Sequence, residues 1–236
     1  MFELALGEML WGRRAVFMAV AAAVPVLLAL GLRLAFASGS ATVVVNGQHL
    51  SPETMFGTAI SLLYLRFIVP ALGVYYGTSM IADEIEDKTI TYLFVRPMRR
   101  GAIVLGKYLA YLVCVLAAVL PSAALMFVVM VPLASMGPLV ETFVRHLEQI
   151  AVGIAAYGAV FVLAGVTFKR PLVGGLIFVF GWEPIAAALP GYVARLTVAH
   201  YLQGGIADGI GLVLASIGAV LLAMRTIEQR EYVLEQ

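Results

Sequence analysis

Long apolar runs separated by short polar connections make up most of the chain. A helix needs about 20 mostly apolar residues to cross a bilayer. The pattern predicts six such spans, at about 15–36, 60–82, 108–134, 147–168, 171–190 and 205–224. Pro121 and Pro132 predict a kink or tilt in the third span. Arg66 interrupts the second span, which leaves open a shorter span entered from a surface helix at 52–65.

Composition supports a membrane protein. Hydrophobic residues make up 62% of the chain and charged residues only 12%, whereas a soluble domain is about half apolar and about a quarter charged. We therefore expect an all-α membrane protein with a single transmembrane domain over residues 1–236. A net charge of +1 gives no basis for nucleic-acid binding, and the single cysteine, Cys114, excludes an intrachain disulfide and a cysteine metal cluster.

Lysine and arginine are distributed unequally between the two sides of the predicted bundle, and such residues favour the cytoplasm. Six spans place both termini on one side, so we predict that both termini are cytoplasmic in the cell (inner) membrane. The stretch 1–14 predicts a helix lying in the cytoplasmic interface rather than a cleavable signal. The segments near 37–57, 135–146 and 191–204 then face outward. The basic residues on the cytoplasmic side are Arg13, Arg14, Lys88, Arg96, Arg99, Arg100, Lys107, Lys169, Arg170, Arg225 and Arg230.

The stretch GAIVLGKY at 101–108 has the spacing of a phosphate-binding loop, but its surroundings do not fit one. Such a loop lies between a strand and a helix and has Ser or Thr after the lysine to reach magnesium. Here Tyr108 follows Lys107, and the next residues enter a membrane span. We interpret the stretch as an amphipathic lead-in to span three, with Arg99, Arg100 and Lys107 at the headgroups and Ile103, Val104 and Leu105 below them.

The segment 83–107 is the one long charged connection expected in the cytoplasm. Four acids at its start are followed by apolar residues and then by arginines. A connection that only reverses the chain needs few residues, so this segment predicts a docking surface. A solvated loop whose arginines only set the topology is the alternative.

This segment resembles the cytoplasmic loop of ABC type-2 permeases, the membrane subunits of ABC exporters. The residues that carry the resemblance are Glu84, Glu86, Thr89, Leu93, Pro97, Arg100 and Lys107, and Lys88 departs from the glycine that many members have before the threonine. The six-span layout and the outward stretch at 182–202 are also similar.

The resemblance implies a half-transporter that pairs with a second permease subunit, which we expect to be a second copy in a homodimer. It also implies a separate cytoplasmic ABC ATPase that binds the ATP and docks on a coupling helix between spans two and three. Acids at the start of that helix suit its dipole, and its apolar residues suit a groove. The residues expected to dock the ATPase are Asp83, Glu84, Glu86, Asp87, Thr89, Leu93, Phe94, Arg96 and Pro97.

Ionisable residues within spans are the best candidates for a translocation path. Arg66 and Glu183 are expected near the outer ends of spans two and five, where they form an ion pair or else lie at the interface with Arg66 snorkelling. Tyr75 and Tyr76 lie in span two beside Gly73 and are candidates for the path or a dimer seam. Small residues in spans two and four predict close helix packing.

No catalytic motif is present, and we expect no metal or cofactor in this chain. The leading interpretation is the permease subunit of an ABC exporter, without a nucleotide site of its own. The alternative is a non-transporting membrane scaffold that recruits a cytoplasmic partner through the same loop. A third possibility, an intramembrane enzyme, is disfavoured because the sequence contains no set of catalytic residues.

Overall fold

The computed structural model describes residues 7, 13–37, 44–45, 48–49, 52–86, 100–132, 136–189, 192–204 and 206–229. It is a bundle of long helices with one very small antiparallel β-hairpin, in which Val44 pairs with His49 and Val45 with Gln48. The prediction of an all-α membrane protein is confirmed. The elements are α2 (Arg13–Ala37), β1 (Val44–Val45), β2 (Gln48–His49), α3 (Pro52–Ala59), π-helix η1 (Ile60–Ile68), α4 (Val69–Glu86), α6 (Arg100–Met130), α7 (Met136–Thr167), α8 (Pro171–Leu176), π-helix η3 (Ile177–Trp182), α9 (Glu183–Ala188), 3-10 helix η4 (Tyr192–Leu196), α10 (Val198–Gln203) and α11 (Ile206–Gln229).

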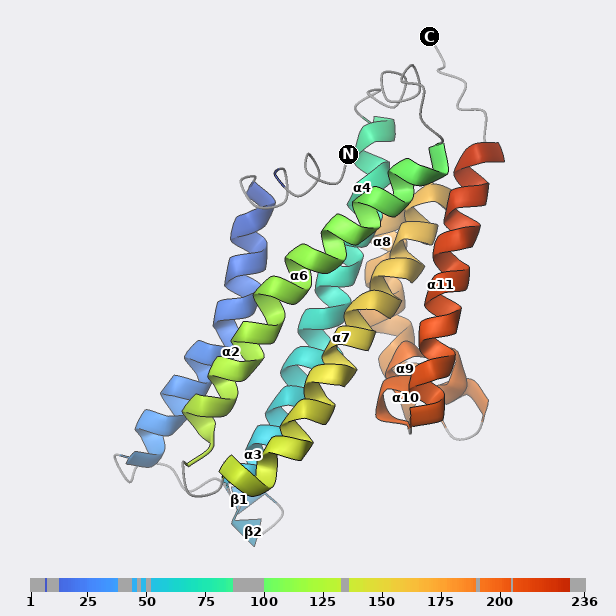
Figure 1. Ribbon diagram of the computed structural model, residues 1–236. Coiled ribbons are helices and arrows are strands. Elements are labelled where there is room, and N and C mark those ends of the chain that lie inside the picture. Colours follow the sequence, from blue (N-terminus) through green and yellow to red (C-terminus); the bar gives the residue numbers. More distant parts are fainter. Residues whose placement is uncertain are drawn as a thin grey trace.

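Helix α7 is the centre of the bundle. It packs along α4 on one side and α11 on another, and also contacts α6, whereas α2 packs mainly against α6. Figure 1 shows the start of α2, the end of α4, the start of α6 and the end of α11 at the same end of the bundle. This arrangement is the one expected for helices that cross a membrane in alternating directions.

Five helical stretches are long and apolar enough to cross a membrane, namely Ala15–Ala35, Met55–Met80, Gly101–Met130, Met136–Thr167 and Ala207–Gln229. The fifth predicted span, 171–190, is the exception, because the apolar helix there covers only Pro171–Ala187. It comprises α8, η3 and α9, and η4 and α10 then lead to α11. In Figure 1, α9 and α10 lie beside the lower part of α11. The fifth segment is therefore short and is followed by additional short helices.

The third and fourth spans differ from their predicted limits. Helix α6 continues through Pro121 but ends at Met130, before Pro132, although the predicted span ran to 134. Pro132 has no backbone N–H to donate, so it favours an end to the helix nearby. Helix α7 begins at Met136, so most of the segment 135–146 expected as a loop is helical.

The small-residue faces predicted on spans two and four pack against each other within one chain. A Cβ added at Gly73 would lie 2.6 Å from the Cβ of Tyr157, and one added at Gly77 would lie 2.7 Å from the Cβ of Phe161. A Cβ at Gly165 would lie 2.9 Å from the carbonyl oxygen of Thr78. Helices α4 and α7 thus approach so closely that only glycine fits at these positions.

The segment 83–107 begins and ends inside long helices rather than as a separate loop. Helix α4 continues to Glu86, and α6 begins at Arg100. Ile103 and Val104 were expected to dip below the headgroups, but both are buried against the protein. The Nζ atom of Lys107 donates a hydrogen bond to the carbonyl oxygen of Met80 at 2.7 Å, which links α6 to α4. The interfacial helix predicted for 1–14 lies almost entirely outside the described residues.

Candidate functional site

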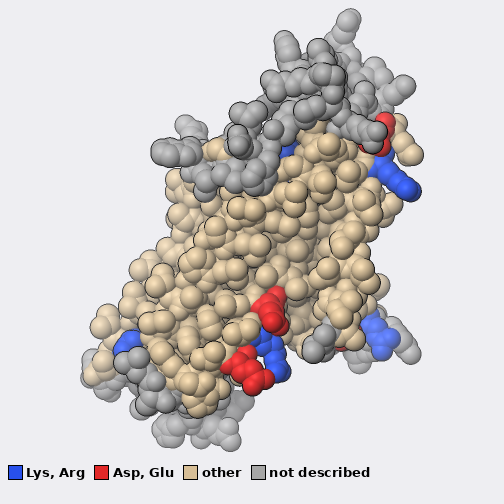
Figure 2. All heavy atoms as spheres, viewed as in Figure 1, with Lys and Arg blue, Asp and Glu red and all other residues tan. Residues whose placement is uncertain are grey.

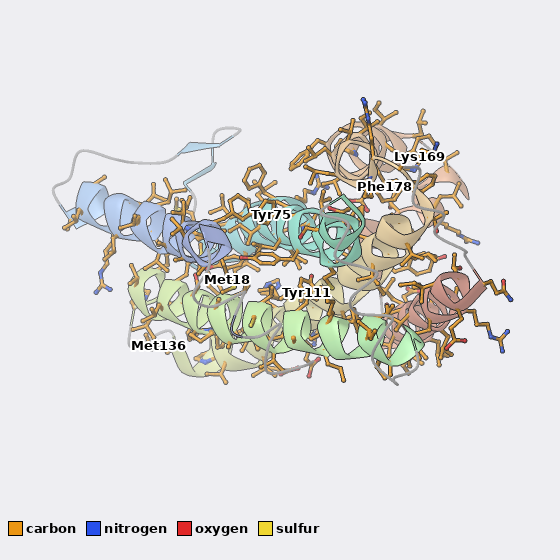
Figure 3. All side chains as sticks on the ribbon, turned by 90° about the horizontal axis from the view of Figure 1, so that it is seen from above. Met18, Tyr75, Tyr111, Met136, Lys169 and Phe178 are labelled. Carbon is orange, nitrogen blue, oxygen red and sulfur yellow. The ribbon has the colours of Figure 1, made fainter. Side chains whose placement is uncertain are left out.

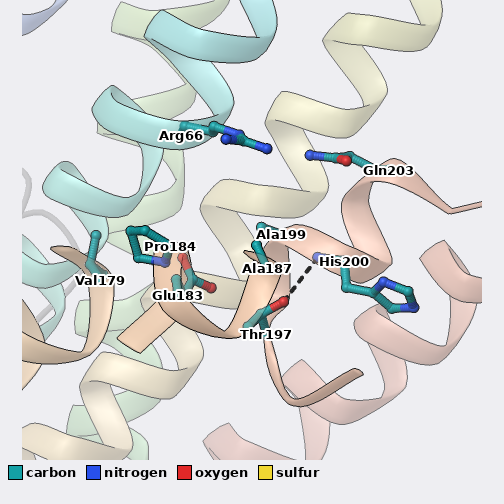
Figure 4. Close-up of a pocket in the computed structure, with 9 residues that line it drawn as sticks. All are labelled: Arg66, Val179, Glu183, Pro184, Ala187, Thr197, Ala199, His200 and Gln203. Carbon is teal, nitrogen blue, oxygen red and sulfur yellow. Dashed lines mark hydrogen bonds between the residues drawn. The ribbon is translucent and has the colours of Figure 1, made fainter. Parts of the chain in front are cut away.

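Two π-helical segments lie on either side of one polar pocket. Arg66 belongs to η1, and Glu183 directly follows η3. π-Helical turns are rare and occur often at functional sites. Figure 4 shows that the side chains around this pocket come from η1, η3, α9 and α10. The pocket, called the outer pocket below, has a volume of about 150 Å³ and is lined by Arg66, Val179, Glu183, Pro184, Ala187, Thr197, Ala199, His200 and Gln203.

The Glu183 side chain is buried, with 6% of its surface exposed, and its carboxyl group is fully engaged. The hydroxyl of Tyr157, on α7, donates a hydrogen bond to Glu183 Oε2 at 2.5 Å. The backbone N–H of Val198 donates to Glu183 Oε1 at 3.1 Å. Burying an acidic group is costly unless it is hydrogen-bonded, so these contacts account for its presence here. Glu183 thereby joins the short fifth helical segment to α7 and to α10.

Arg66 shares the pocket with Glu183 but does not pair with it. Arg66 is exposed, and among the described residues it forms neither an ion pair nor a hydrogen bond. In Figure 4 its guanidinium group points across the pocket toward the amide of Gln203. The sequence left open an Arg66–Glu183 ion pair, but the structure places Tyr157 and Val198 on the carboxyl group instead.

Arg66 also lies at a particular depth in the bundle. It falls inside the apolar stretch Met55–Met80, which is long enough to cross a membrane. About 21 Å of helix separates Arg66 from Met80 at 1.5 Å per residue. The outer pocket therefore lies beside a membrane-spanning stretch and not beyond its end.

Tyr75 and Tyr76 belong to a separate aromatic cluster nearer the other end of α4. The ring of Tyr75 contacts Phe17 of α2, with centroids 4.6 Å apart. Tyr76 is fully buried and lies 6.4 Å from Tyr111 of α6, measured between ring centroids. Figure 3 shows Tyr111 between α4 and α6, and Tyr75 on the side of α4 nearer α2. The structure thus brings Arg66 and Glu183 together and places the two tyrosines elsewhere.

A larger groove of about 900 Å³ opens between α7 and α11. Its floor is apolar and includes Val152, Val213 and Leu214. Charged residues of α7 line its edge, where Arg145 pairs with Glu141 at 3.3 Å. Figure 2 shows charged side chains near the ends of the molecule and a cluster of both signs in the lower middle of this face, with uncharged residues above that cluster. The groove thus combines an apolar floor with a charged edge on α7.

Sequence reasoning identified Arg66 and Glu183 but missed their neighbours. Tyr157 lies in an apolar span and has no motif around it, although a tyrosine hydroxyl at that depth signals a need for a polar partner. Thr197 and Gln203 fall in a segment expected only to face outward. No sequence signal indicated the π-helical turns.

Comparison with protein families gives an independent result. The family model described as ABC-2 family transporter protein matches residues 9–203. The chain belongs to this family. The match covers the outer pocket, the aromatic cluster and the segment 83–107, and it ends before α11. The comparison with curated proteins found no match.

Membership of the ABC-2 family identifies the chain as a permease subunit of an ABC transporter. It also implies that the chain is embedded in a membrane with several spans and works with an ABC ATPase. The resemblance stated from the sequence is therefore confirmed. Of the residues expected to dock the ATPase, Asp83, Glu84 and Glu86 fall in the last turns of α4. Asp87, Thr89, Leu93, Phe94, Arg96 and Pro97 lie outside the described residues.

Proposed function

We propose that this ABC-2 family subunit exports its substrate, driven by ATP that a separate ATPase subunit hydrolyses while docked on the segment 83–107. The proposal places that segment and both termini in the cytoplasm, and the chain in the cell (inner) membrane. The distribution of lysine and arginine supports this orientation. In this proposal the chain has no nucleotide site, and Lys107 serves as a link between helices instead.

The observation that carries the proposal is the way the helices on both sides of segment 83–107 are fastened together. Lys107 of α6 donates to the carbonyl oxygen of Met80 on α4 at 2.7 Å. At the start of α6, Gly101 packs against Met224 and Glu228 of α11, where an added Cβ would lie 2.9 Å from Glu228 Oε1. A force applied to the segment would therefore move α4, α6 and α11 together.

Helix α4 connects this end of the bundle to both groups of candidate path residues. The run from Pro52 to Glu86 is helical throughout, and it carries Arg66 and Tyr76. A stiff element of this kind transmits a displacement along its length. We propose that closure of the docked ATPases moves α4 and so changes access between the aromatic cluster and the outer pocket. Arg66, Tyr75, Tyr76 and Glu183 are the proposed path residues.

We further propose that the functional unit contains two permease chains of this sequence. ABC exporters place their substrate path between two membrane halves, and this chain supplies one half. Chemical cross-linking in native membranes, followed by mass determination, is expected to give a species of twice the chain mass. Only monomers at all cross-linker concentrations would contradict the homodimer.

Docking is tested by reversing one charge and truncating one apolar anchor in the segment. The variant Glu84→Lys with Leu93→Ala is expected to lose co-purification with the partner ATPase. It removes a charge that aligns the segment with the ATPase surface and an apolar side chain that fills a groove of the ATPase. Transport by membrane vesicles should fall with it. The readouts are the ATPase-to-permease ratio after affinity purification and ATP-dependent substrate uptake by inverted vesicles.

A matched control uses the same two kinds of change away from the segment 83–107. Glu141, near the start of α7, and Leu214, within α11, are both exposed, so Glu141→Lys with Leu214→Ala should leave the ATPase ratio unchanged. If Glu84→Lys with Leu93→Ala retained both the ATPase and transport, the docking role would be wrong. If it retained the ATPase and lost transport, docking would lie elsewhere on the chain.

A further inference from the structure

We propose that the outer pocket binds a single anionic group, a phosphate or a carboxylate, through Arg66 and Gln203. This inference deepens the proposed function. It rests on the proposed function only in one respect, namely that the pocket lies on the path of the substrate. Binding itself depends on the side chains described here, and the test below measures binding without the ATPase.

The pocket offers hydrogen-bond donors that the protein leaves unused. The guanidinium of Arg66 has five N–H donors and no acceptor, and among the described residues none of the five is engaged. Figure 4 shows Gln203 on α10 facing it across the pocket. The forked guanidinium matches the geometry of a carboxylate or phosphate and binds either through two parallel hydrogen bonds.

Glu183 does not take the place of that anion. Its two carboxyl oxygens accept hydrogen bonds from the Tyr157 hydroxyl and the Val198 amide, and the side chain is 6% exposed. Arg66, in contrast, is exposed. The carboxyl group is therefore committed to holding α9 and α10 in place, and the arginine remains available to a ligand.

Apolar rings beside the pocket indicate that the anion belongs to an amphiphile. The rings of Phe67 of η1 and Phe180 of η3 are in tilted contact, with centroids 5.6 Å apart and planes at 57°. Both are exposed, Phe67 by 57% and Phe180 by 44%, as is Ile185 by 59%. Each of these residues directly follows a residue that lines the pocket, and Arg66 lies within the apolar stretch Met55–Met80. A molecule with its charged group at Arg66 has an apolar surface next to it for an acyl chain.

The volume of about 150 Å³ suits one headgroup-sized anion rather than a large polar molecule. Two sources share this chemistry, an anionic lipid headgroup and a water-soluble phosphate. The exposed phenylalanines favour the lipid, and the experiment separates the two.

The test uses tryptophan fluorescence as a local reporter. The chain has two tryptophans, so Trp11→Phe leaves Trp182, which directly precedes Glu183, as the single emitter. The full chain is reconstituted in vesicles of phosphatidylcholine that contain a second, brominated lipid. In one series the brominated lipid is phosphatidylglycerol, and in the other it is phosphatidylcholine, with the bromine on the acyl chain in both. We expect brominated phosphatidylglycerol to quench Trp182 at lower mole fraction, and Arg66→Gln to weaken that preference on the order of tenfold. Arg145→Gln, an outward arginine outside the pocket, should keep it.

A second arm measures the melting temperature in detergent with inorganic phosphate against chloride at equal ionic strength. Preferential quenching that is lost in Arg66→Gln assigns the site to a lipid anion. A phosphate-dependent rise in melting temperature that is lost in Arg66→Gln, without lipid preference, assigns it to a soluble anion. Equal quenching by both lipids with no effect of phosphate would overturn the proposal, as would preferences that survive in Arg66→Gln. None of these outcomes depends on whether the chain transports.

Discussion

At the scale of single residues, the contact between Tyr157 and Glu183 is the most consequential polar interaction of the described chain. It joins α7 to the short fifth segment through a hydrogen bond of 2.5 Å between two buried side chains. A buried acceptor that loses its donor carries the full cost of desolvation. This contact holds Glu183, which lines the outer pocket, against α7.

Replacing Tyr157 by Phe should lower the free energy of unfolding by about 1–3 kcal/mol, because Oε2 of Glu183 loses its donor while Oε1 keeps the Val198 N–H. The measurement is reversible unfolding of the detergent-purified chain. Tyr201→Phe is the matched control, since that partly buried tyrosine makes no hydroxyl hydrogen bond within the described residues.

A double-mutant cycle sharpens this test. Glu183→Leu alone should also destabilise, whereas Glu183→Leu combined with Tyr157→Phe should cost less than the sum, because both polar partners are then removed together. Strictly additive effects would show that the hydrogen bond contributes nothing of its own to stability.

At the scale of helices, the close approach of α4 and α7 determines the shape of the bundle. The contact runs from Gly73 and Gly77 on α4 to Gly165 on α7. In a membrane such packing has no hydrophobic driving force of its own and depends on dispersion contacts between closely fitted surfaces. Because α4 continues directly from η1, which carries Arg66, an error in this packing would also displace the outer pocket.

Gly77→Ala is expected to destabilise the fold by about 1–3 kcal/mol, since its Cβ would lie 2.7 Å from the Cβ of Phe161, an atom fixed to the backbone of α7. The same change at Gly218 of α11, where nothing lies within 4 Å, should be neutral or stabilise by up to about 1 kcal/mol. Melting temperatures of the two purified variants provide the comparison. Equal melting temperatures would mean that α4 and α7 are not in close contact.

The sequence predicted helices well where hydrophobic runs are long, and less well where helices end or change type. Apolar length alone identifies α2 and α11, but the start of α7 at Met136 was missed because residues 136–148 carry charges typical of a loop. The π-helical turns beside Arg66 and Glu183 depend on packing between distant segments, which one sequence does not display. For the same reason the two residues were identified individually, and the hydrogen bond of Glu183 to Tyr157 was not.

At the scale of the whole molecule, the distribution of lysine and arginine supports the proposal that the end with both termini faces the cytoplasm. Lys169 lies between α7 and α8, and Glu141 lies near the start of α7, so the two mark opposite ends of one central helix. Both are exposed, and the side chain of Glu141 is 86% accessible. In the proposed orientation, which the positive-inside rule supports through the lysines and arginines, Lys169 is cytoplasmic and Glu141 is outside.

Single-cysteine labelling tests this orientation directly. Cys114 is the only cysteine of the chain and is buried, so Cys114→Ala provides a cysteine-free background. In intact cells, a membrane-impermeant maleimide should label Glu141→Cys and leave Lys169→Cys unmodified, and permeabilising the cells should then label both. Labelling of Lys169→Cys alone in intact cells would reverse the topology and move the segment 83–107 outside, where no ATPase has access to it. The docking and export proposals would then fail together, whereas anion binding at Arg66 would have to be assigned to the inner leaflet.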